Sequence, residues 1–366
     1  MTNPEKISPL QIILLLSISR ISIVLLWFHV ANQDVWITEI LALFYVAVFC
    51  APLLFLQKQF TNLTLIEYLP ILTGKLAGKI LGLFYVGYFL FVLIMVLSLF
   101  DNILRPINFP ETPDYAILSL ALITCSYGAF KGLECIARTA EIFTSLILVT
   151  IVFYTILQIP DMHFKVFLPV LADSTFAEIN SLAFKTAAGI HEIVFLAMLA
   201  PSINKKVSIN RVFFWSVIVI TVFSLIIIVP TIAGLGVELS KKTFDPYYLF
   251  IKQINIYDFI TRIEFLMVAA WNIGMFLKIS FMLYLATLGF VQAGELKNRN
   301  AFIIPMAAGV FLIALKTNIL KSVTVFTIIE RYVPYINLVF IFGIPVVMLI
   351  MFFLKKAMKV KRNCNG

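Results

Sequence analysis

Ten apolar stretches dominate the chain and constrain its fold more than any other feature. A helix needs about 20 apolar residues to cross the hydrocarbon core of a bilayer. In that core only helices and closed barrels satisfy every backbone hydrogen bond, and runs of this length are typical of helices. The sequence therefore predicts an all-α integral membrane protein with about ten transmembrane helices. The stretches are 9–31, 36–56, 80–103, 115–130, 141–159, 181–200, 212–233, 263–290, 300–316 and 333–354.

The charged residues are few and lie mainly between these stretches. They make up 13% of the chain, against about 25% in an ordinary soluble domain. The connection 57–79 contains three lysines, and the C-terminal segment KKAMKVKR adds five basic residues, whereas the first connection, HVANQD, has neither Lys nor Arg. Because basic loops stay in the cytoplasm, we expect both termini there. The net charge of +9 then reflects orientation in the lipid bilayer, and nucleic acid is not an expected partner.

The loop lengths indicate an internal repeat. A long connection follows the second apolar stretch of the first five, at 57–79, and the second of the last five, at 234–262. Five spans in each half predict a five-plus-five inverted repeat with halves 1–160 and 161–366, and such folds bind solutes near the membrane midplane. Both long connections mix apolar and polar residues, so we expect short interfacial helices there.

The first stretch contains a polar cluster, Ser17, Ser19, Arg20 and Ser22, at the depth where a spanning helix is most deeply embedded. A guanidinium stays charged at any physiological pH and is costly in the membrane. At 100° per residue the four positions point all round a helix. Two alternatives follow: the helix unwinds locally to expose backbone groups to a ligand, or the serines bond back to their own helix and only Arg20 needs a partner.

The sixth stretch carries a second group of ionisable residues in KTAAGIHEIVFLAML. Lys185, Gly189 and Glu192 share one helical face, at i, i+4 and i+7. Glu192 is the acidic residue placed deep in a membrane segment, so it is the natural partner of Arg20. Such a pair either serves a ligand or a gate, or joins the two halves structurally. His191 points about 100° away from Glu192 and is expected to be a satisfied core histidine.

Other polar residues extend the predicted site. Trp271 and Lys278 lie on one face of the eighth stretch with Asn272 beside them, and Tyr85 and Tyr88 lie in the third. These side chains either line a cavity or simply pack. One deep acid and two or three deep cations favour a ligand that bears a carboxylate over a free metal cation.

No pattern indicates catalysis or a cofactor. The sequence has no GxSxG, HExxH or phosphate-binding loop. Its four cysteines and three histidines do not have the spacing of a metal site or a disulfide framework. We therefore expect neither an enzyme nor a bound metal or cofactor.

Several loop motifs resemble those of a known family. The chain is similar to the B subunits of nutrient germinant receptors of spore-forming bacteria, the spore germination permease-like proteins. The resemblance rests on NFPETPDY (108–115), KGLECIAR (131–138), FLPVL (167–171), PSINKK (201–206) and FDPYYLFIKQINIYDFITRIEFLMVAAW (244–271). It implies the five-plus-five fold of the amino acid–polyamine–organocation superfamily, also found in LeuT-like transporters. It also implies a spore inner membrane location, a small germinant such as an amino acid, and partnership with receptor A and C subunits.

Two functional hypotheses follow. The first is a ligand-sensing subunit that binds a germinant between helices 1, 3, 6 and 8 and passes the signal to its partners. The second is a secondary transporter that couples amino acid uptake to protons through Glu192 or His191. Because fold does not fix function, the discriminating observation is biochemical: a transporter works alone in vesicles, whereas a receptor subunit needs its partners. An ion-conducting subunit is a weaker third hypothesis, since no ring of pore-lining charge is evident.

Overall fold

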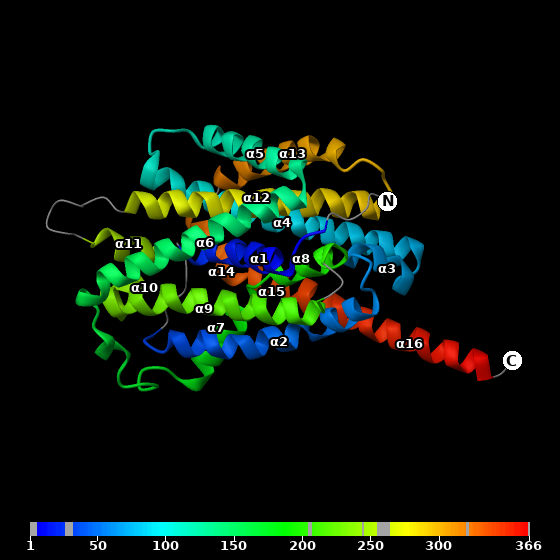
Figure 1. Cartoon of the computed structure of the whole chain (residues 1–366), viewed down its shortest axis with the longest axis horizontal. Helices are drawn as coiled ribbons and strands as arrows, with labels where there is room; N and C mark the ends of the chain where they lie inside the picture. The colour runs from blue at the N-terminus through cyan, green and yellow to red at the C-terminus, as the bar shows by residue number, and fades with distance from the viewer. Residues whose placement is uncertain are drawn as a thin grey trace.

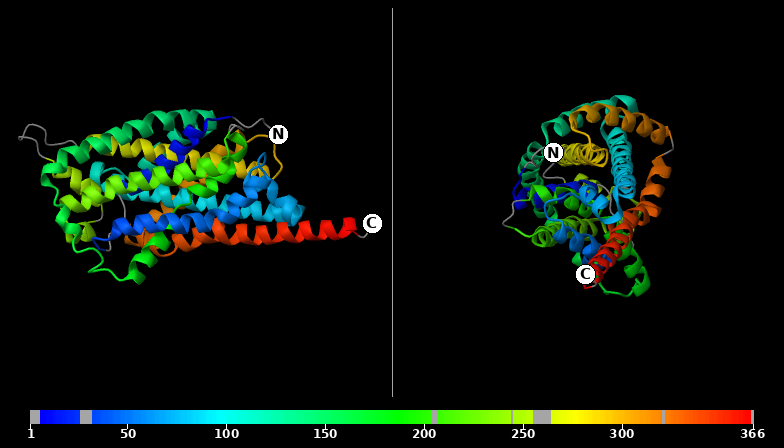
Figure 2. Two further views of the ribbon diagram at one scale, coloured as in Figure 1. Left: turned by 60° about the horizontal axis from the view of Figure 1, so that its bottom comes forward. Right: turned by 90° about the vertical axis from the view of Figure 1, so that its right-hand side faces the viewer.

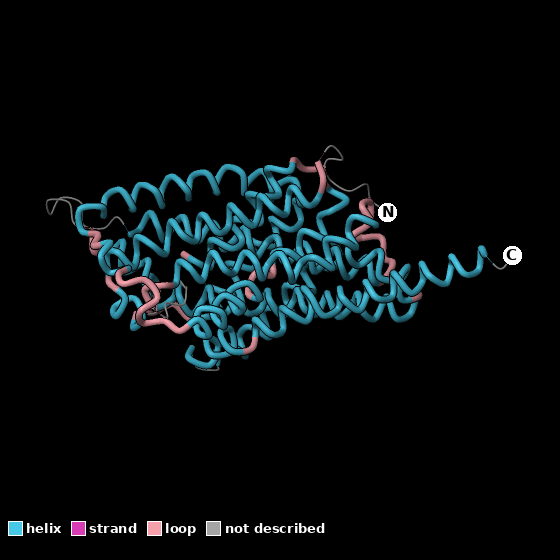
Figure 3. The backbone as a smooth tube through the Cα atoms, turned by 90° about the horizontal axis from the view of Figure 1, so that it is seen from below, coloured by secondary structure: helices cyan, strands magenta, loops and turns pink. Residues whose placement is uncertain are grey.

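The protein is a bundle of long helices whose loops gather mainly at the two ends (Figure 3). The computed structural model describes residues 6–25, 32–203, 207–243, 245–254, 264–319 and 322–364. Within these ranges the only β-type pairing is an isolated bridge between Ile7 and Ile203. The prediction of an all-α protein is confirmed.

Seven of the ten predicted segments form helices long and apolar enough to cross a membrane. The other three, 9–31, 115–130 and 300–316, coincide with shorter helices, α1 (Pro9–Val24), α5 (Asp114–Lys131) and α13 (Ile303–Ile319). Residues 26–31 of the first segment lie outside the described residues. The seven spans contain α2 (Val35–Gln59), α4 (Lys75–Asn108), α6 (Leu133–Gln158), α7 (Phe176–Ala188) with α8 (Glu192–Leu199), α9 (Ile209–Leu235), α12 (Glu264–Ala293) and α15 (Val333–Leu338) with α16 (Ile344–Cys364).

The two long connections contain short helices, as predicted. The first holds α3 (Leu65–Thr73), and the second holds α10 (Val237–Lys242) and α11 (Pro246–Lys252); residues 255–262 of the second lie outside the described residues. Helix α3 begins at a capping box in which Thr64 and Glu67 satisfy each other's backbone N–H groups. The remaining elements are α14 (Ser322–Arg331), a π-helical turn (Val339–Gly343) and 3₁₀ turns at Ile159–Asp161, Phe164–Phe167, Ala200–Ser202 and Asn300–Phe302.

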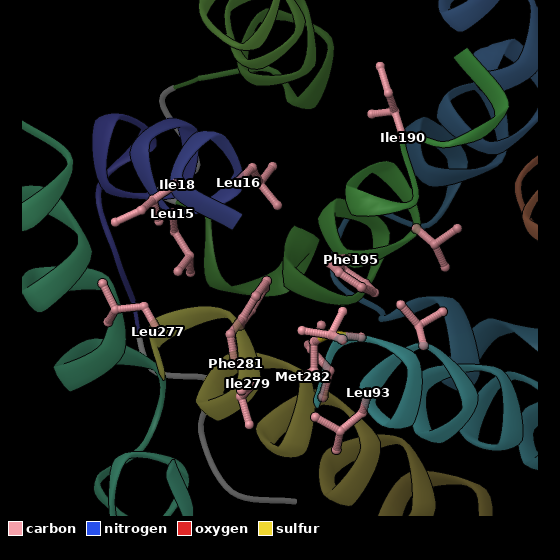
Figure 4. Packing of buried hydrophobic residues seen from close by; sticks show 14 of the residues in the cluster. Leu15, Leu16, Ile18, Leu93, Ile190, Phe195, Leu277, Ile279, Phe281 and Met282 are labelled. Carbon is pink, nitrogen blue, oxygen red and sulfur yellow. The ribbon is translucent and has the colours of Figure 1, made fainter. Parts of the chain in front are cut away.

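Helix α12 is the most buried of the seven spans and forms the centre of the core. It packs along α4 and also contacts α1, α5 and α6. Apolar side chains from α1, α4, α8 and α12 converge there (Figure 4), and the rings of Phe195 and Phe281 meet edge to face with centroids 5.6 Å apart. This apolar packing surrounds the polar groups described below.

Two helices end inside the bundle rather than at its ends. Helix α7 stops at Ala188, Gly189 caps it, and α8 restarts at Glu192. Helix α1 stays helical through its polar cluster and ends at Val24. Of the two alternatives for that cluster, local unwinding is therefore wrong. The hydroxyl of Ser17 donates to the Ile13 carbonyl at 2.7 Å, and that of Ser22 donates to the Ser19 carbonyl at 3.2 Å.

The start of α1 and the end of α16 lie at the same end of the bundle (Figure 1). Helix α16 extends beyond the other helices at that end (Figure 2). An even number of membrane crossings would produce this arrangement.

Candidate functional site

A buried ionic cluster joins three helices at the start of α8. The ammonium of Lys278 donates to Glu192 Oε1 at 2.9 Å and to the Ser19 carbonyl at 2.8 Å, and the Ser19 hydroxyl donates to the same Glu192 oxygen at 3.3 Å. The side chains of Lys278 and Glu192 are 0% and 1% exposed. We call Ser19, Glu192 and Lys278 the closed cluster, because its two opposite charges pair directly within the protein. Only Glu192 Oε1 takes part in these contacts, and Glu192 Oε2 is buried without a hydrogen-bond partner in the described structure.

The closed cluster corrects one expectation. The ion-pair partner of Glu192 is Lys278 on α12, and no ion pair between Glu192 and Arg20 lies within 4.0 Å in the described structure. The position suits a carboxylate, because Glu192 lies in the first turn of α8, where free N–H groups and the helix dipole favour negative charge. Removing either charge alone would leave its partner buried and unpaired.

Two predicted residues on α12 bond to helix backbone. The indole N–H of Trp271 donates to the Ser22 carbonyl at 2.7 Å, and this carbonyl belongs to the last turn of α1, where no intrahelical donor remains. Trp271 therefore completes the end of α1 and fixes it against α12. The Asn272 amide donates to the Val268 carbonyl of its own helix at 2.8 Å.

The two predicted tyrosines on α4 bond to the segment that precedes α16. Tyr85 donates to the Phe340 carbonyl at 3.0 Å, and Tyr88 donates to the side-chain oxygen of Asn337 at 2.9 Å. The rings of Tyr88 and Phe340 stack with centroids 4.2 Å apart. Both tyrosines are buried, and these contacts tie α4 to the last span.

On another side of α1, Arg20 faces a cavity of about 160 Å³. In the described residues its guanidinium has neither a hydrogen bond nor an ion pair, although it is only partly exposed. Gly189 leaves room beside it: a Cβ added there would lie 3.8 Å from Arg20 Nη1. The cavity therefore adjoins the interruption between α7 and α8.

The cavity has charged groups on apolar walls. Lys185 adds a second cation, Glu39 on α2 and Glu330 on α14 supply two carboxylates, and His191 contributes its imidazole. The apolar lining comes from Ile23, Val24, Val35, Val92, Met95, Val96, Leu99, Leu182, Ile228, Ile329, Val333 and Pro334. We call this space the Arg20 cavity. A site with few polar groups in an apolar lining is typical of small-molecule binding.

The predicted residues separate into three groups. Arg20 and Gly189 line the Arg20 cavity. Ser19, Glu192 and Lys278 form the closed cluster, and the remaining six, Ser17, Ser22, Tyr85, Tyr88, Trp271 and Asn272, make the contacts described above. The shared helical face of Lys185, Gly189 and Glu192 does not persist, because the interruption after Ala188 separates Glu192 from the cavity.

Two carboxylates of the cavity were not predicted, and one residue has a different setting from the one expected. Glu39 lies only four residues into the second apolar stretch and was not considered a deep acid. Glu330 lies in the connection before the last span. His191, expected to be a satisfied core residue, borders the cavity: its Nδ1 lies 3.2 Å from the Gly189 carbonyl, and its Nε2 is buried without a hydrogen-bond partner in the structure. In the described part of the chain no three His, Cys, Asp or Glu side chains gather as metal ligands would.

The fold and the cavity define a helical membrane protein of several spans with a partly open cavity of about 160 Å³ beside an interrupted helix. A family model, described as spore germination protein, matches residues 6–322, and the chain belongs to this spore permease family. It is 24% identical over 297 residues to spore germination protein KB of Bacillus subtilis, covering 78% of this chain and 77% of that protein. It is 26% identical to spore germination protein XB of Bacillus anthracis over 53% of this chain and 54% of that protein.

Proposed function

We propose that this spore germination protein is the ligand-sensing subunit of a nutrient germinant receptor. The germinant, an amino acid or a similar small molecule with a carboxylate, binds in the Arg20 cavity. The observation that carries the proposal is a guanidinium without a protein partner among the described residues, facing a cavity beside an interrupted helix. Guanidinium and carboxylate groups pair in a bidentate geometry that is strong in an apolar site.

The proposed binding site differs from the one expected between helices 1, 3, 6 and 8. The cavity keeps walls from helices 1, 3 and 6 of that expectation, which are α1, α4 and α7. Its other walls come from α2, α9 and the α14–α15 segment. Helix α12 is not part of it, since Lys278 is occupied by Glu192 and Ser19. A ligand held by Arg20 would bridge α1 to the α7–α8 interruption. It would favour one arrangement of these helices to the extent that it binds that arrangement more tightly.

We also propose that the chain crosses the membrane ten times as two inverted five-helix repeats, 1–160 and 161–366. Corresponding helices of the two halves pack together, namely α2 with α9, α4 with α12 and α5 with α13. The fourth helix of each half, α5 or α13, is short, and the first helix of each half ends within the bundle. These features support the repeat.

The proposed setting is the spore inner membrane, with both termini in the cytoplasm and with receptor A and C subunits as partners. The names of relatives such as spore germination proteins KB and XB support a role in germination. In this proposal germinant binding changes the packing of the α1, α7 and α8 segments, and the partners detect that change.

The test is a binding scan on the purified full-length protein in lipid nanodiscs. Amino acids, nucleosides and sugars are screened by thermal shift on wild type, Arg20→Ala and Arg138→Ala. Arg138 is a matched control, because it is an exposed arginine paired with Glu134. We expect a carboxylate-bearing compound to raise the Tm of wild type and of Arg138→Ala but not of Arg20→Ala. An equal shift in all three proteins would contradict the site.

A proton-coupled amino acid transporter is the second candidate. One contact favours it: His191 borders the cavity and its Nε2 lies 3.5 Å from Glu192 Oε1. A proton on His191 would therefore interact with both the cavity and the closed cluster. Uptake of a labelled amino acid into vesicles that contain this protein alone, driven by a pH gradient, would favour the transporter.

A further inference from the structure

Glu39 is the second unpaired charge in the Arg20 cavity. Its carboxylate lies on α2, one turn after the start of that helix, and is only partly exposed. In the described structure it has no hydrogen bond and no ion pair within 4.0 Å. Arg20 is near enough for the two charges to attract each other, but they do not make a direct ion pair.

This arrangement is unfavourable as far as protein groups alone are concerned. Each charge has lost part of its hydration to apolar walls, and neither has the close partner that would offset this cost. The two sign-opposed groups face one space of about 160 Å³, which is close to the size of an apolar protein cavity that holds benzene, about 150 Å³. A small molecule that carries both a carboxylate and an ammonium group would satisfy both charges at once.

We propose that Glu39 is a specificity-determining residue that receives the ammonium group of an amino acid whose carboxylate is held by Arg20. This assignment rests on the proposed function and adds that the receptor selects zwitterions over simple carboxylates. The apolar walls, including Val92, Met95 and Leu182, would contact an aliphatic side chain.

Glu330 is the competing carboxylate, and two observations favour Glu39. Glu330 is exposed, so its charge remains largely hydrated, and it already interacts with another group. Glu39 is less exposed than Glu330 and lies near enough to Arg20 for the two charges to interact. A charge-assisted hydrogen bond is stronger where water is excluded, so the less exposed acid contributes more to selectivity.

The experiment compares amino acids with the same molecules lacking the amino group. The probes are L-alanine, L-valine and L-leucine against propionate, 3-methylbutanoate and 4-methylpentanoate. Affinities are measured calorimetrically on the full-length protein in nanodiscs for wild type, Arg20→Ala, Glu39→Gln, Glu39→Asp and the matched control Glu330→Gln. We expect wild type and Glu330→Gln to prefer at least one amino acid over its carboxylate by about 10- to 100-fold, as one charge-assisted hydrogen bond would give. Glu39→Gln should reduce that preference to less than about threefold without weakening carboxylate binding, and Glu39→Asp should retain part of it.

Each outcome bears on one assignment. A preference that Glu39→Gln leaves intact, or that only Glu330→Gln removes, overturns the role of Glu39. Arg20-dependent binding of both probes with no preference in wild type does the same but leaves the proposed function standing. Absence of binding by all six probes contradicts the cavity assignment itself. The Tm of each variant without ligand is the control for folding. We expect the Glu→Gln variants to fold like wild type, because this substitution preserves the shape of the side chain.

Discussion

Ser19 and Arg20 are neighbours in α1, yet they belong to two polar regions of opposite character. On the Ser19 side, the closed cluster pairs a buried cation directly with a buried anion through contacts of 2.8 to 3.3 Å, and only the second oxygen of the Glu192 carboxylate has no hydrogen-bond partner in the described structure. On the Arg20 side, two cations and two carboxylates surround a cavity, and in the described residues the guanidinium has no partner. Successive helical residues point about 100° apart, so one helix serves both regions.

Under the proposed function, the difference separates charges with a structural role from charges that a ligand would pair. A buried ion pair has little capacity to bind a ligand, and breaking it lowers stability because one charge is left buried and unpaired. An unpaired charge that faces a cavity can bind a ligand, and removing it should cost little stability. Substitutions in the two regions should therefore separate stability from binding.

The largest expected effect is on stability, from Lys278→Ala. This change leaves Glu192 buried without its cation, and we expect a loss of about 3–5 kcal/mol in the free energy of unfolding. Thermal unfolding in nanodiscs measures it. As the control, the double substitution Lys278→Met with Glu192→Gln removes both charges and should recover most of the loss. A stable Lys278→Ala protein would mean that the closed cluster is not structural.

The second effect is on binding, from Arg20→Ala. We expect a loss of about 1.5–3 kcal/mol in ligand binding, or roughly 10- to 100-fold in Kd. The Tm without ligand should change little, because Arg20 makes no direct ion pair in the described structure, although its attraction to Glu39 is lost. Titration calorimetry and thermal shift on the same sample check both parts. A fall in Tm as large as that of Lys278→Ala would mean that Arg20 is also structural, which contradicts the division into a structural cluster and a binding cavity.

A third effect concerns how α1 ends. Trp271→Phe removes the hydrogen bond to the Ser22 carbonyl but keeps an aromatic ring stacked near Phe100, whose centroid is 5.4 Å from that of Trp271. We expect a cost of about 1 kcal/mol in unfolding free energy and little change in affinity. Denaturation and binding curves measure the two quantities. A large loss of affinity with full stability would place Trp271 in the ligand site.

The smallest effect is expected from Gly189→Ala. Gly189 has ordinary helical backbone angles, so the added methyl group is tolerated, but it would lie 3.2 Å from the Thr186 carbonyl oxygen and 3.8 Å from Arg20 Nη1. We expect affinity to fall by less than tenfold, below about 1.4 kcal/mol, with Tm nearly unchanged. Improved affinity would indicate that the ligand does not approach this side of Arg20.

The sequence predicts the helices well, because hydropathy over about 20 residues is a strong signal of membrane crossing. All ten predicted segments coincide with helices in the described part of the chain, and seven of these helices are both long and apolar enough to span a membrane. The short helices of the long connections were also predicted, since mixed apolar and polar residues there suit an interfacial helix.

Pairing within the bundle was less predictable. Helical phase shows which residues share a face but not which helix lies opposite, so Glu192 was paired with Arg20 instead of Lys278. The interruption after Ala188 also broke the phase that joined Glu192 to Lys185 and Gly189. Glu39 was missed because it lies near the start of its apolar stretch, close to the membrane surface, where an acid is usually hydrated.

The most direct test of the account is a ligand-bound structure of the full-length protein with the amino acid that shifts Tm most. The account predicts ligand density in the Arg20 cavity, with the carboxylate within hydrogen-bond distance of Arg20 and the Lys278–Glu192 pair intact. Density on the α12 side, with Lys278 released from Glu192 to hold the ligand, would contradict it.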